Sequence, residues 1–343
     1  MKDAIQNTFN KWNEDKDFSG VFSVAGSDGV IFQQANGHRN KAEELPNDVD
    51  TVFGIASGTK LFTGLAVCKL IDEGKLSPED KFCDVLTQDL GQIDSRVTIH
   101  QLLTHTSGVG EYIDEEADDM DEQLAALSHK YPCYLWTHLD YYLQMITPLP
   151  PKFEPDARYA YSNAGYILLG LVIEAVGGMP YQQYVQENII IPCKLGRTGF
   201  YRMDALPANA ALGYTQNEET EEWRANIFAM PIIGGSDGGI FTCAGDLDKL
   251  WRAIFSNKIL SESMTQTFLK QQVMIDEEDG ESYGLGVYRS VDADKIVYYA
   301  VGWDAGVSFF TSYFPRTDVT TSLLMNTNNG YYSLIWDLFN LLG

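Results

Sequence analysis

Four short apolar runs near the end of the chain decide the fold. They are YGLGVYRS (283–290), KIVYYAVGW (295–303), VSFFTSYF (307–314) and TTSLLMNT (320–327). Each is rich in aromatic and β-branched residues, which favour strands, and Asp, Pro and Gly separate them. Because short connections join antiparallel neighbours, these runs predict an antiparallel meander.

The start of the chain predicts two more strands and a helix. GVFSVAG (20–26) and GVIFQQANG (29–37) are apolar runs split by a Ser-Asp-Gly break that is typical of a hairpin. Residues 2–16 have apolar side chains at helical spacing, and so do residues 331–342 at the other end. A helix is therefore expected at each terminus.

The middle of the chain is predicted to be mostly helical. Residues 57–73 form one helical pattern, and residues 161–178 are apolar nearly all round, as in a buried helix. Further helices are expected to begin near Ser77 and within residues 97–110.

This order of elements predicts the α/β (α+β) class, with an antiparallel sheet flanked by terminal helices plus a mostly helical domain. Residues 1–56 and 230–343 are predicted to build a discontinuous sheet domain, and residues 57–229 the helical domain. The active site is expected between them.

Composition and charge narrow the range of functions. The 343 residues are 45% hydrophobic and 21% charged, as in ordinary globular proteins, and the net charge is −24. A surface with this much negative charge repels nucleic-acid phosphates and anionic lipids, so we expect neither nucleic acid nor a membrane as a partner. We expect a small molecule instead. Five scattered cysteines without a CxxC pair predict neither disulfides nor a zinc site, and no metal or cofactor is expected. The first residues lack the apolar core of a secretory signal, which predicts a cytoplasmic protein.

Residues 111–122 contain eight acidic side chains. A calcium loop requires a glycine at its sixth position and alternating ligands, and this run has neither. We therefore expect a solvated surface loop.

The first candidate for chemistry is the pair Ser57 and Lys60. On a helix, three residues of spacing place both side chains on one face, one turn apart. A serine hydroxyl becomes a nucleophile when a base removes its proton, and a buried lysine with a lowered pKa is such a base. A helix N-cap serine beside a surface lysine gives the same pattern, so the pair alone does not decide.

The second candidate is Tyr161-Ser162-Asn163, at the head of the apolar helix. A tyrosine near a lysine can shuttle protons, and an asparagine amide can donate and accept hydrogen bonds at once. A helix N-cap beside a core tyrosine is the structural alternative.

Several long blocks of sequence together resemble the serine β-lactamase and penicillin-binding protein superfamily. The resemblance is to its class C β-lactamase-like branch, with related esterases and D-aminopeptidases, and spans roughly residues 18–328. Besides the two candidates, it includes FSGVFSVAGSDGVIF (18–32), VTIHQLLTHTSGVGEY (97–112), FEPDARYAYSNAGYILLGLVIEAVGG (153–178), GGSDGGIFTCAGDLDKL (234–250), YGLGVY (283–288) and VGWDAG (301–306).

The resemblance implies a role for each matching residue. Ser57 corresponds to the acylated nucleophile, Lys60 to its base or proton relay, and Tyr161 to a second proton shuttle. Asn163 corresponds to the residue that positions the substrate and Lys60. Tyr112 could line the pocket or pack in the core or on the surface, and His105 is expected to be a structural loop histidine.

The third motif of the family, Lys-Thr-Gly or His-x-Gly, is replaced here by Trp303-Asp304-Ala305, followed by Gly306. In this alignment the backbone N–H of Gly306 would complete the oxyanion hole with that of Ser57. Trp303 and Asp304 would contact the substrate, and Asp304 would disfavour a substrate carboxylate. An Asp304 that pairs with a cation or points away is the alternative.

The resulting functional hypothesis is a serine hydrolase that forms an acyl-enzyme from an ester or amide. It is expected to act as an esterase, amidase or peptidase rather than an efficient β-lactamase. The alternative is a non-catalytic penicillin-binding-like or regulatory binding protein, which the altered third motif favours and the retained quartet of Ser57, Lys60, Tyr161 and Asn163 disfavours. The sequence does not indicate the oligomeric state.

Overall fold

An antiparallel sheet forms the base of the protein in the computed structural model, which describes all residues except 15, 116, 118–119, 218 and 329. Within the described residues, eight strands pair in the order β2-β1-β14-β13-β12-β11-β10-β9. Their bounds are β1 Gly20–Gly26, β2 Gly29–Asn36, β9 Val273–Asp276, β10 Glu281–Tyr283, β11 Tyr288–Asp292, β12 Lys295–Asp304, β13 Val307–Phe314 and β14 Val319–Met325. The predicted meander and N-terminal hairpin are confirmed, and β1 joins them by pairing with β14.

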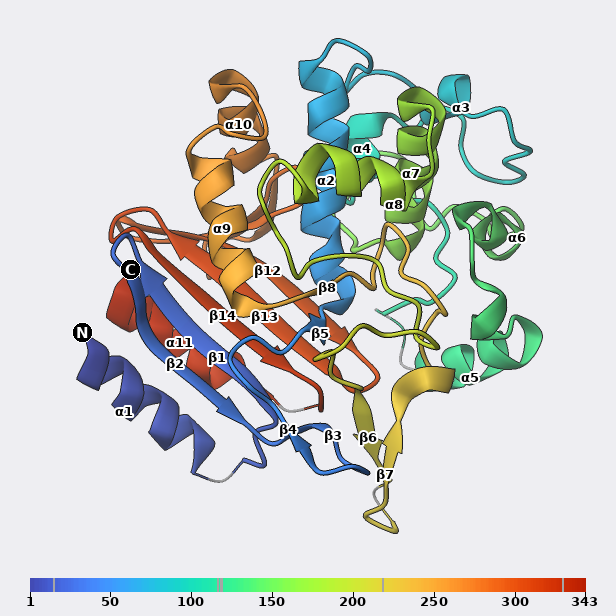
Figure 1. The fold of residues 1–343 in the computed structure, drawn as a ribbon. Helices are drawn as coiled ribbons and strands as arrows, with labels where there is room; N and C mark the ends of the chain where they lie inside the picture. The colour runs from blue at the N-terminus through green and yellow to red at the C-terminus, as the bar shows by residue number, and fades with distance from the viewer. Residues whose placement is uncertain (15, 116, 118–119, 218, 329) are drawn as a thin grey trace.

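The two terminal helices cover one face of the sheet, where Figure 1 shows them side by side. They are α1 (Lys2–Asn13) and α11 (Tyr332–Leu342), so the expected terminal helices are confirmed. Phe9 of α1 and Leu338 of α11 pack into one buried cluster with Phe22 and Phe310 of the sheet. Burial of these large side chains holds both ends of the chain on the sheet.

The opposite face carries the helical part of the molecule (Figure 1). The longer helices here are α2 (Thr59–Asp72), α5 (Met120–Lys130), α7 (Asn163–Gly177), α9 (Ala244–Phe255) and α10 (Glu262–Leu269). Shorter ones are α3 (Phe82–Val85), α4 (Ile99–Leu103), α6 (Leu143–Ile146) and α8 (Tyr181–Val185). Short strands complete the chain: β3 (His38–Asn40), β4 (Leu45–Pro46), β5 (Phe53–Gly54), β6 (Tyr214–Gln216), β7 (Trp223–Ala225) and β8 (Phe241–Thr242).

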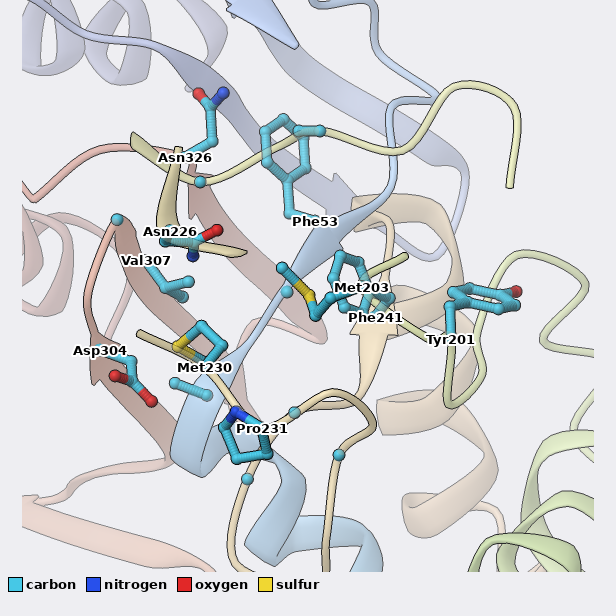
Figure 2. Close-up of a pocket in the computed structure, with 18 of the residues that line it drawn as sticks. Phe53, Tyr201, Met203, Asn226, Met230, Pro231, Phe241, Asp304, Val307 and Asn326 are labelled. Atoms are coloured by element: carbon cyan, nitrogen blue, oxygen red, sulfur yellow. The ribbon is translucent and has the colours of Figure 1, made fainter. Parts of the chain in front are cut away.

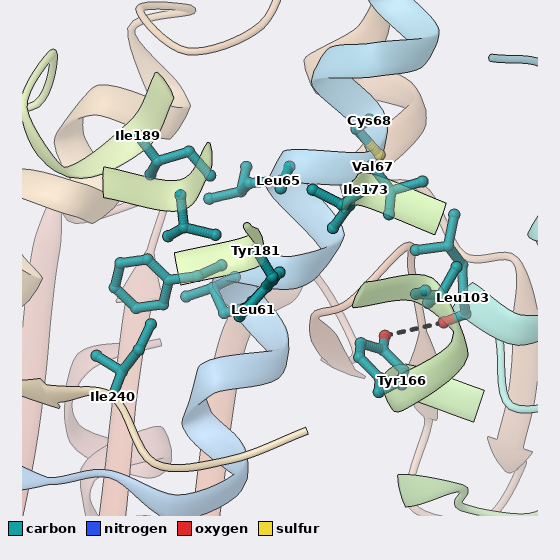
Figure 3. Close-up of a cluster of buried hydrophobic side chains, with 14 of the residues drawn as sticks. Leu61, Leu65, Val67, Cys68, Leu103, Tyr166, Ile173, Tyr181, Ile189 and Ile240 are labelled. Atoms are coloured by element: carbon teal, nitrogen blue, oxygen red, sulfur yellow. Dashed lines mark hydrogen bonds between the residues drawn. The ribbon is translucent and has the colours of Figure 1, made fainter. Parts of the chain in front are cut away.

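Helices α2 and α7 form the centre of the larger core. Leu61 and Leu65 of α2 and Ile173 of α7 are buried together, and Tyr166 donates to the Leu103 carbonyl at 3.0 Å (Figure 3). The same cluster reaches Phe309 and Leu324 of the sheet. The predicted division into two domains stays a prediction.

Of two further predicted helices, one is wrong and one is confirmed. The helix predicted to begin near Ser77 is wrong, because residues 77–80 form a turn closed by the Asp80 N–H on the Ser77 carbonyl, and α3 begins later. The helix within 97–110 is confirmed but short. Thr98 caps it through the Gln101 N–H, and the chain leaves it where His105 takes φ +59°.

Among the described residues, no single helix combines the length and apolar composition needed to cross a membrane. The bent pair Asn163–Gly177 and Tyr181–Ile190 meets that test together, by length and composition.

Candidate active site

Ser57 and Lys60 lie where the chain turns from the sheet into α2. Ser57 is in a short 3₁₀ turn, Ala56–Gly58, which runs directly into α2. The Lys60 amine donates to the Ser57 hydroxyl at 3.0 Å, so the two predicted residues meet. Ala56, before the serine, has φ +45°, a strained conformation for a residue with a side chain.

Lys60 is buried, with 2% of its surface exposed, in a cage of polar oxygens. Its amine donates at 2.7 Å to Asn163 Oδ1 and at 2.7 Å to the Asp237 carbonyl. Burial lowers the pKa of Lys60, and nearby carboxylates, led by Asp237, oppose that shift. A lowered pKa makes the neutral amine, which can accept a proton, more accessible.

Tyr161 reaches the same point from the start of α7. Its side chain lines the same cavity as Ser57, and its ring centroid is 4.7 Å from the Lys60 amine. Burial raises the pKa of Tyr161 well above its usual value, so the phenol keeps its proton at neutral pH. Ser57, Lys60 and Tyr161 therefore converge as predicted.

His105 has the structural role expected from the sequence. Its Nδ1 accepts the backbone N–H of Ser162 at 3.0 Å, and its ring lies 4.7 Å from that of Tyr161. Burial lowers the pKa of His105 well below its usual value. The histidine thus fixes the segment that carries Tyr161.

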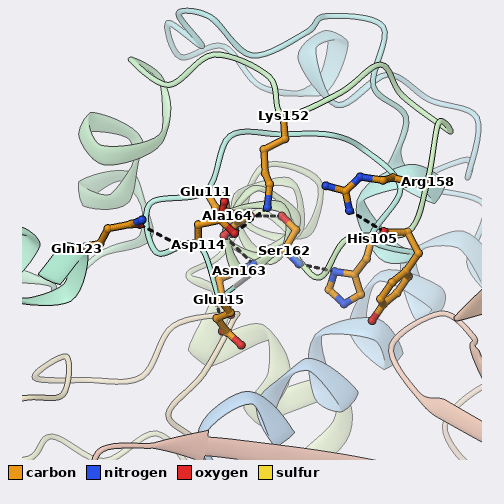
Figure 4. A network of polar contacts seen from close by, with 11 residues as sticks. His105, Glu111, Asp114, Glu115, Gln123, Lys152, Arg158, Ser162, Asn163 and Ala164 are labelled. Carbon is orange, nitrogen blue, oxygen red and sulfur yellow. Dashed lines mark hydrogen bonds and ion pairs between the residues drawn. The ribbon is translucent and has the colours of Figure 1, made fainter. Parts of the chain in front are cut away.

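Two glutamates hold the start of α7, and both belong to the run predicted to be a solvated loop (Figure 4). Glu111 accepts from the backbone N–H of Asn163 at 3.1 Å, from that of Ala164 at 3.2 Å and from the Ser162 hydroxyl. Glu115 accepts from Asn163 Nδ2 at 2.7 Å, so it turns Asn163 Oδ1 toward Lys60.

The solvated-loop prediction is therefore wrong for Glu111, whereas Glu115 is exposed in a turn as predicted, although it also binds Asn163. Helix α5 begins inside the run, at Met120. Residues 116 and 118–119 lie outside the described part of the chain. The free N–H groups at the start of α7 favour an acceptor there, and this is the physical reason for the position of Glu111.

Tyr112 packs in the core rather than against a cavity. It is buried, and its hydroxyl donates to Asp237 Oδ2 at 2.5 Å. The backbone carbonyl of Asp237 accepts a hydrogen bond from Lys60, so Asp237 links Tyr112 to Lys60.

The end of β12 corrects the predicted register of the third motif. The N–H of Gly306 is occupied by Asn328 Oδ1 at 2.7 Å, which removes it from the oxyanion role. Gly302 instead passes against the serine turn, since a Cβ there would lie 2.1 Å from the Ile55 carbonyl oxygen and 3.0 Å from the Gly58 nitrogen. The hairpin closes at Asp304 and Val307, so the strand meets the turn four residues earlier than expected.

Two cavities adjoin the turn that carries Ser57. The first, which we call the aromatic cavity, has a volume of about 500 Å³. It is lined by Ser57, Tyr161, Gly302 and Trp303 together with aromatic side chains of β11, β12 and α11. Trp303, a predicted substrate contact, is 54% exposed here.

The second, the methionine cavity, lies beyond the end of β12 (Figure 2). Met203, Met230 and Phe241 line it, and Asp304 and Asp237 stand at its polar side. Burial raises the pKa of Asp304 to about 7, and its carboxylate accepts the Ala305 N–H at 2.8 Å. Trp303 and Asp304, which were both predicted to contact the substrate, therefore line different cavities.

The described part of the chain contains no group of three or more His, Cys, Asp or Glu side chains arranged to hold a metal ion.

Comparisons with known proteins show the family to which the chain belongs. The family model described as Beta-lactamase matches residues 5–337. A penicillin-binding protein of Bacillus subtilis is 26% identical over 87% of this chain, and the chain spans 66% of its length. The crystal structure of a penicillin binding protein from Bacillus halodurans is 37% identical, with a TM-score of 0.90 over 98% of this chain and 99% of that one. A D-stereospecific amidohydrolase from Streptomyces shares the fold, at 23% identity and a TM-score of 0.82 over 98% of this chain and 97% of that one. The chain belongs to the β-lactamase family.

Proposed function

We propose that this protein is a serine hydrolase that cleaves small esters or amides through an acyl-enzyme. The observation that carries the proposal is the meeting of three side chains at the mouth of a cavity: the Lys60 amine bonds to the Ser57 hydroxyl, and Tyr161 lies beside both. A nucleophile within reach of a base and a proton donor is the arrangement that covalent catalysis requires.

In the first half of the reaction, Ser57 Oγ attacks the carbonyl carbon and its proton passes to the neutral Lys60 amine. The lowered pKa of Lys60 supports this role. Tyr161 delivers a proton to the leaving group as the carbonyl–leaving-group bond breaks, and Lys60 returns a proton to the phenol.

In the second half, water attacks the acyl carbon; Tyr161 takes the proton of the water as its own phenol proton passes to the neutral Lys60 amine. The bond between the acyl carbon and Ser57 Oγ then breaks, Lys60 gives its proton to Ser57, and the acid product leaves.

The oxyanion hole is assigned to the backbone N–H groups of Ser57 and Trp303. Gly302 contacts the serine turn, and Trp303 is the next residue and lines the same cavity as Ser57. Two backbone donors aimed at the developing negative charge are worth several kcal/mol in such sites, at about 2.7–4 kcal/mol per donor.

The two cavities are assigned to the two sides of the scissile bond. Tyr161 protonates the leaving group, so the leaving group occupies the aromatic cavity, which Tyr161 lines. The acyl substituent then points into the methionine cavity, which begins at Ala56 and Gly238 beside the serine.

The test is a panel of p-nitrophenyl esters, D-amino-acid amides and β-lactams, with fluorophosphonate labelling. We expect Ser57→Ala to lose labelling and at least about four orders of magnitude in kcat/KM. Labelling and turnover that survive in this variant would refute the proposal. A wild-type protein that binds β-lactams but is neither labelled nor active would favour the non-catalytic binding protein. The cytoplasmic location stays a prediction from the N-terminal sequence.

A further inference from the structure

The aromatic cavity differs in charge from a site built for a carboxylate. Among the described residues that line it, three are acidic, Glu115, Asp279 and Glu281, and none is Lys, Arg or His. Lys60 stands behind Ser57, where its amine is committed to three acceptors. A carboxylate on the leaving group would face these acidic groups without a cation to pair with it.

Many of the side chains that line the same cavity are aromatic. Tyr288 and Tyr299 stack with centroids 5.1 Å apart, and Tyr331 and Tyr332 stack at 5.2 Å. Trp303 and Trp336 are 54% and 50% exposed. Large rings left half exposed at a cavity wall indicate a binding surface, and the face of an indole attracts a cation.

Glu281 lies among these rings and accepts a hydrogen bond from the Tyr299 hydroxyl. This contact fixes a carboxylate at the wall of the cavity, next to the ring stack of Tyr299 and Tyr288. A cation in the cavity would meet an ion-pair partner and ring faces at once.

We propose that the leaving-group side of this site binds an apolar group that carries a positive charge, such as an alkylated ammonium, and rejects a free carboxylate. The proposal rests on the proposed function, because it places the leaving group in the aromatic cavity. It extends that function by naming the class of leaving group.

Three phenyl acetates test it, with CH₂N(CH₃)₃⁺, CH₂C(CH₃)₃ or CH₂CO₂⁻ in the meta position. The first two have nearly the same shape, and the methylene limits differences in leaving-group acidity. Rates are divided by those of hydroxide hydrolysis. We expect kcat/KM for the cation to exceed that for the neutral ester about tenfold, and that for the carboxylate to be lowest.

Glu281→Gln removes one charge and keeps an acceptor for Tyr299, so the preference for the cation over the neutral ester should fall severalfold. Glu278→Gln is the matched control, because Glu278 is exposed on the neighbouring turn and does not line this cavity. An equal loss in both variants would show that the overall negative charge attracts the cation, and would overturn the proposal. So would equal normalised rates for the three wild-type esters, even with the Ser57→Ala result intact.

A binding measurement separates this proposal from the proposed function. Benzyltrimethylammonium is titrated into Ser57→Ala and followed by tryptophan fluorescence, with neopentylbenzene and phenylacetate as the neutral and anionic probes. Selective binding of the cation, weakened by Glu281→Gln and by Trp336→Leu, would support the cavity assignment even if no ester were turned over. Binding without charge preference would overturn it.

Discussion

Two regions meet at Ser57, and they are built differently. The starts of α2 and α7 form a closed polar network in which Lys60 alone makes three hydrogen bonds. The end of β12 contributes Gly302, whose backbone contacts the serine turn, and Trp303, whose side chain is half exposed. The first region fixes reacting groups through buried hydrogen bonds, and the second presents a surface. Such a division allows the substrate to change while the chemistry stays constant.

The largest expected effect comes from the first region. Lys60→Met keeps the length of the side chain but removes the base, so kcat should fall by about three orders of magnitude for every substrate in the panel. Steady-state kinetics measure it, with the melting temperature as a check on folding. Lys69→Met is the control, since Lys69 lies on the same helix and pairs with Glu73 at the surface. A loss confined to one leaving group would assign Lys60 to recognition instead.

Gly302→Ala tests whether β12 meets the serine turn where the structure places it. The added Cβ would lie 2.1 Å from a backbone oxygen, so strand and turn must separate. Because the Trp303 N–H would move with the strand, we expect kcat/KM to fall about a hundredfold. Ala305→Ser, in the hairpin loop, should leave activity unchanged. Unchanged kinetics in Gly302→Ala would remove the oxyanion assignment from Trp303.

The same two regions show what a sequence alone can predict. Ser57 and Lys60 are three residues apart, one in the 3₁₀ turn and the other in the first turn of α2, so local geometry sufficed to pair them. Glu111 was missed because its partners at residues 162–164 are about fifty positions away, and eight acidic neighbours made the run look solvated. Gly306 was misassigned because Gly302-Trp303-Asp304-Ala305-Gly306 has a glycine at both ends, and only strand pairing decides which one meets the serine.

The network at α7 should also be visible in the stability of the protein. Burial raises the pKa of Glu111 from 4.5 to about 8, although its hydrogen bonds act in the opposite direction. The folded protein then holds this proton to a higher pH than the unfolded chain, so the stability from Glu111 is complete below about pH 4.5 and is lost as the pH rises to about 8.

The amide in Glu111→Gln does not ionise, so this variant lacks the pH-dependent loss of stability. Between pH 5 and pH 8 its melting temperature should therefore gain roughly 3 °C relative to wild type. Calorimetry at several pH values measures the difference, and Glu43→Gln at an exposed position is the control. A relative loss with rising pH would mean that the carboxylate is ionised in the folded protein and caps the helix as an anion.

The smallest effect is expected at Asp304, although the sequence analysis predicted that this residue disfavours a substrate carboxylate. Asp304 faces the methionine cavity and accepts the Ala305 N–H, and a pKa of about 7 means that its charge changes near neutral pH. Asp304→Asn should change kcat/KM for p-nitrophenyl butyrate by less than about threefold, while a small inflection near pH 7 disappears from the profile. The preference among the three phenyl acetates should be unchanged, because their leaving groups bind in the aromatic cavity, on the opposite side of Ser57 from Asp304. If Asp304→Asn instead restored turnover of the carboxylate ester, the leaving group would lie beside Asp304 and the two cavities would have to exchange roles.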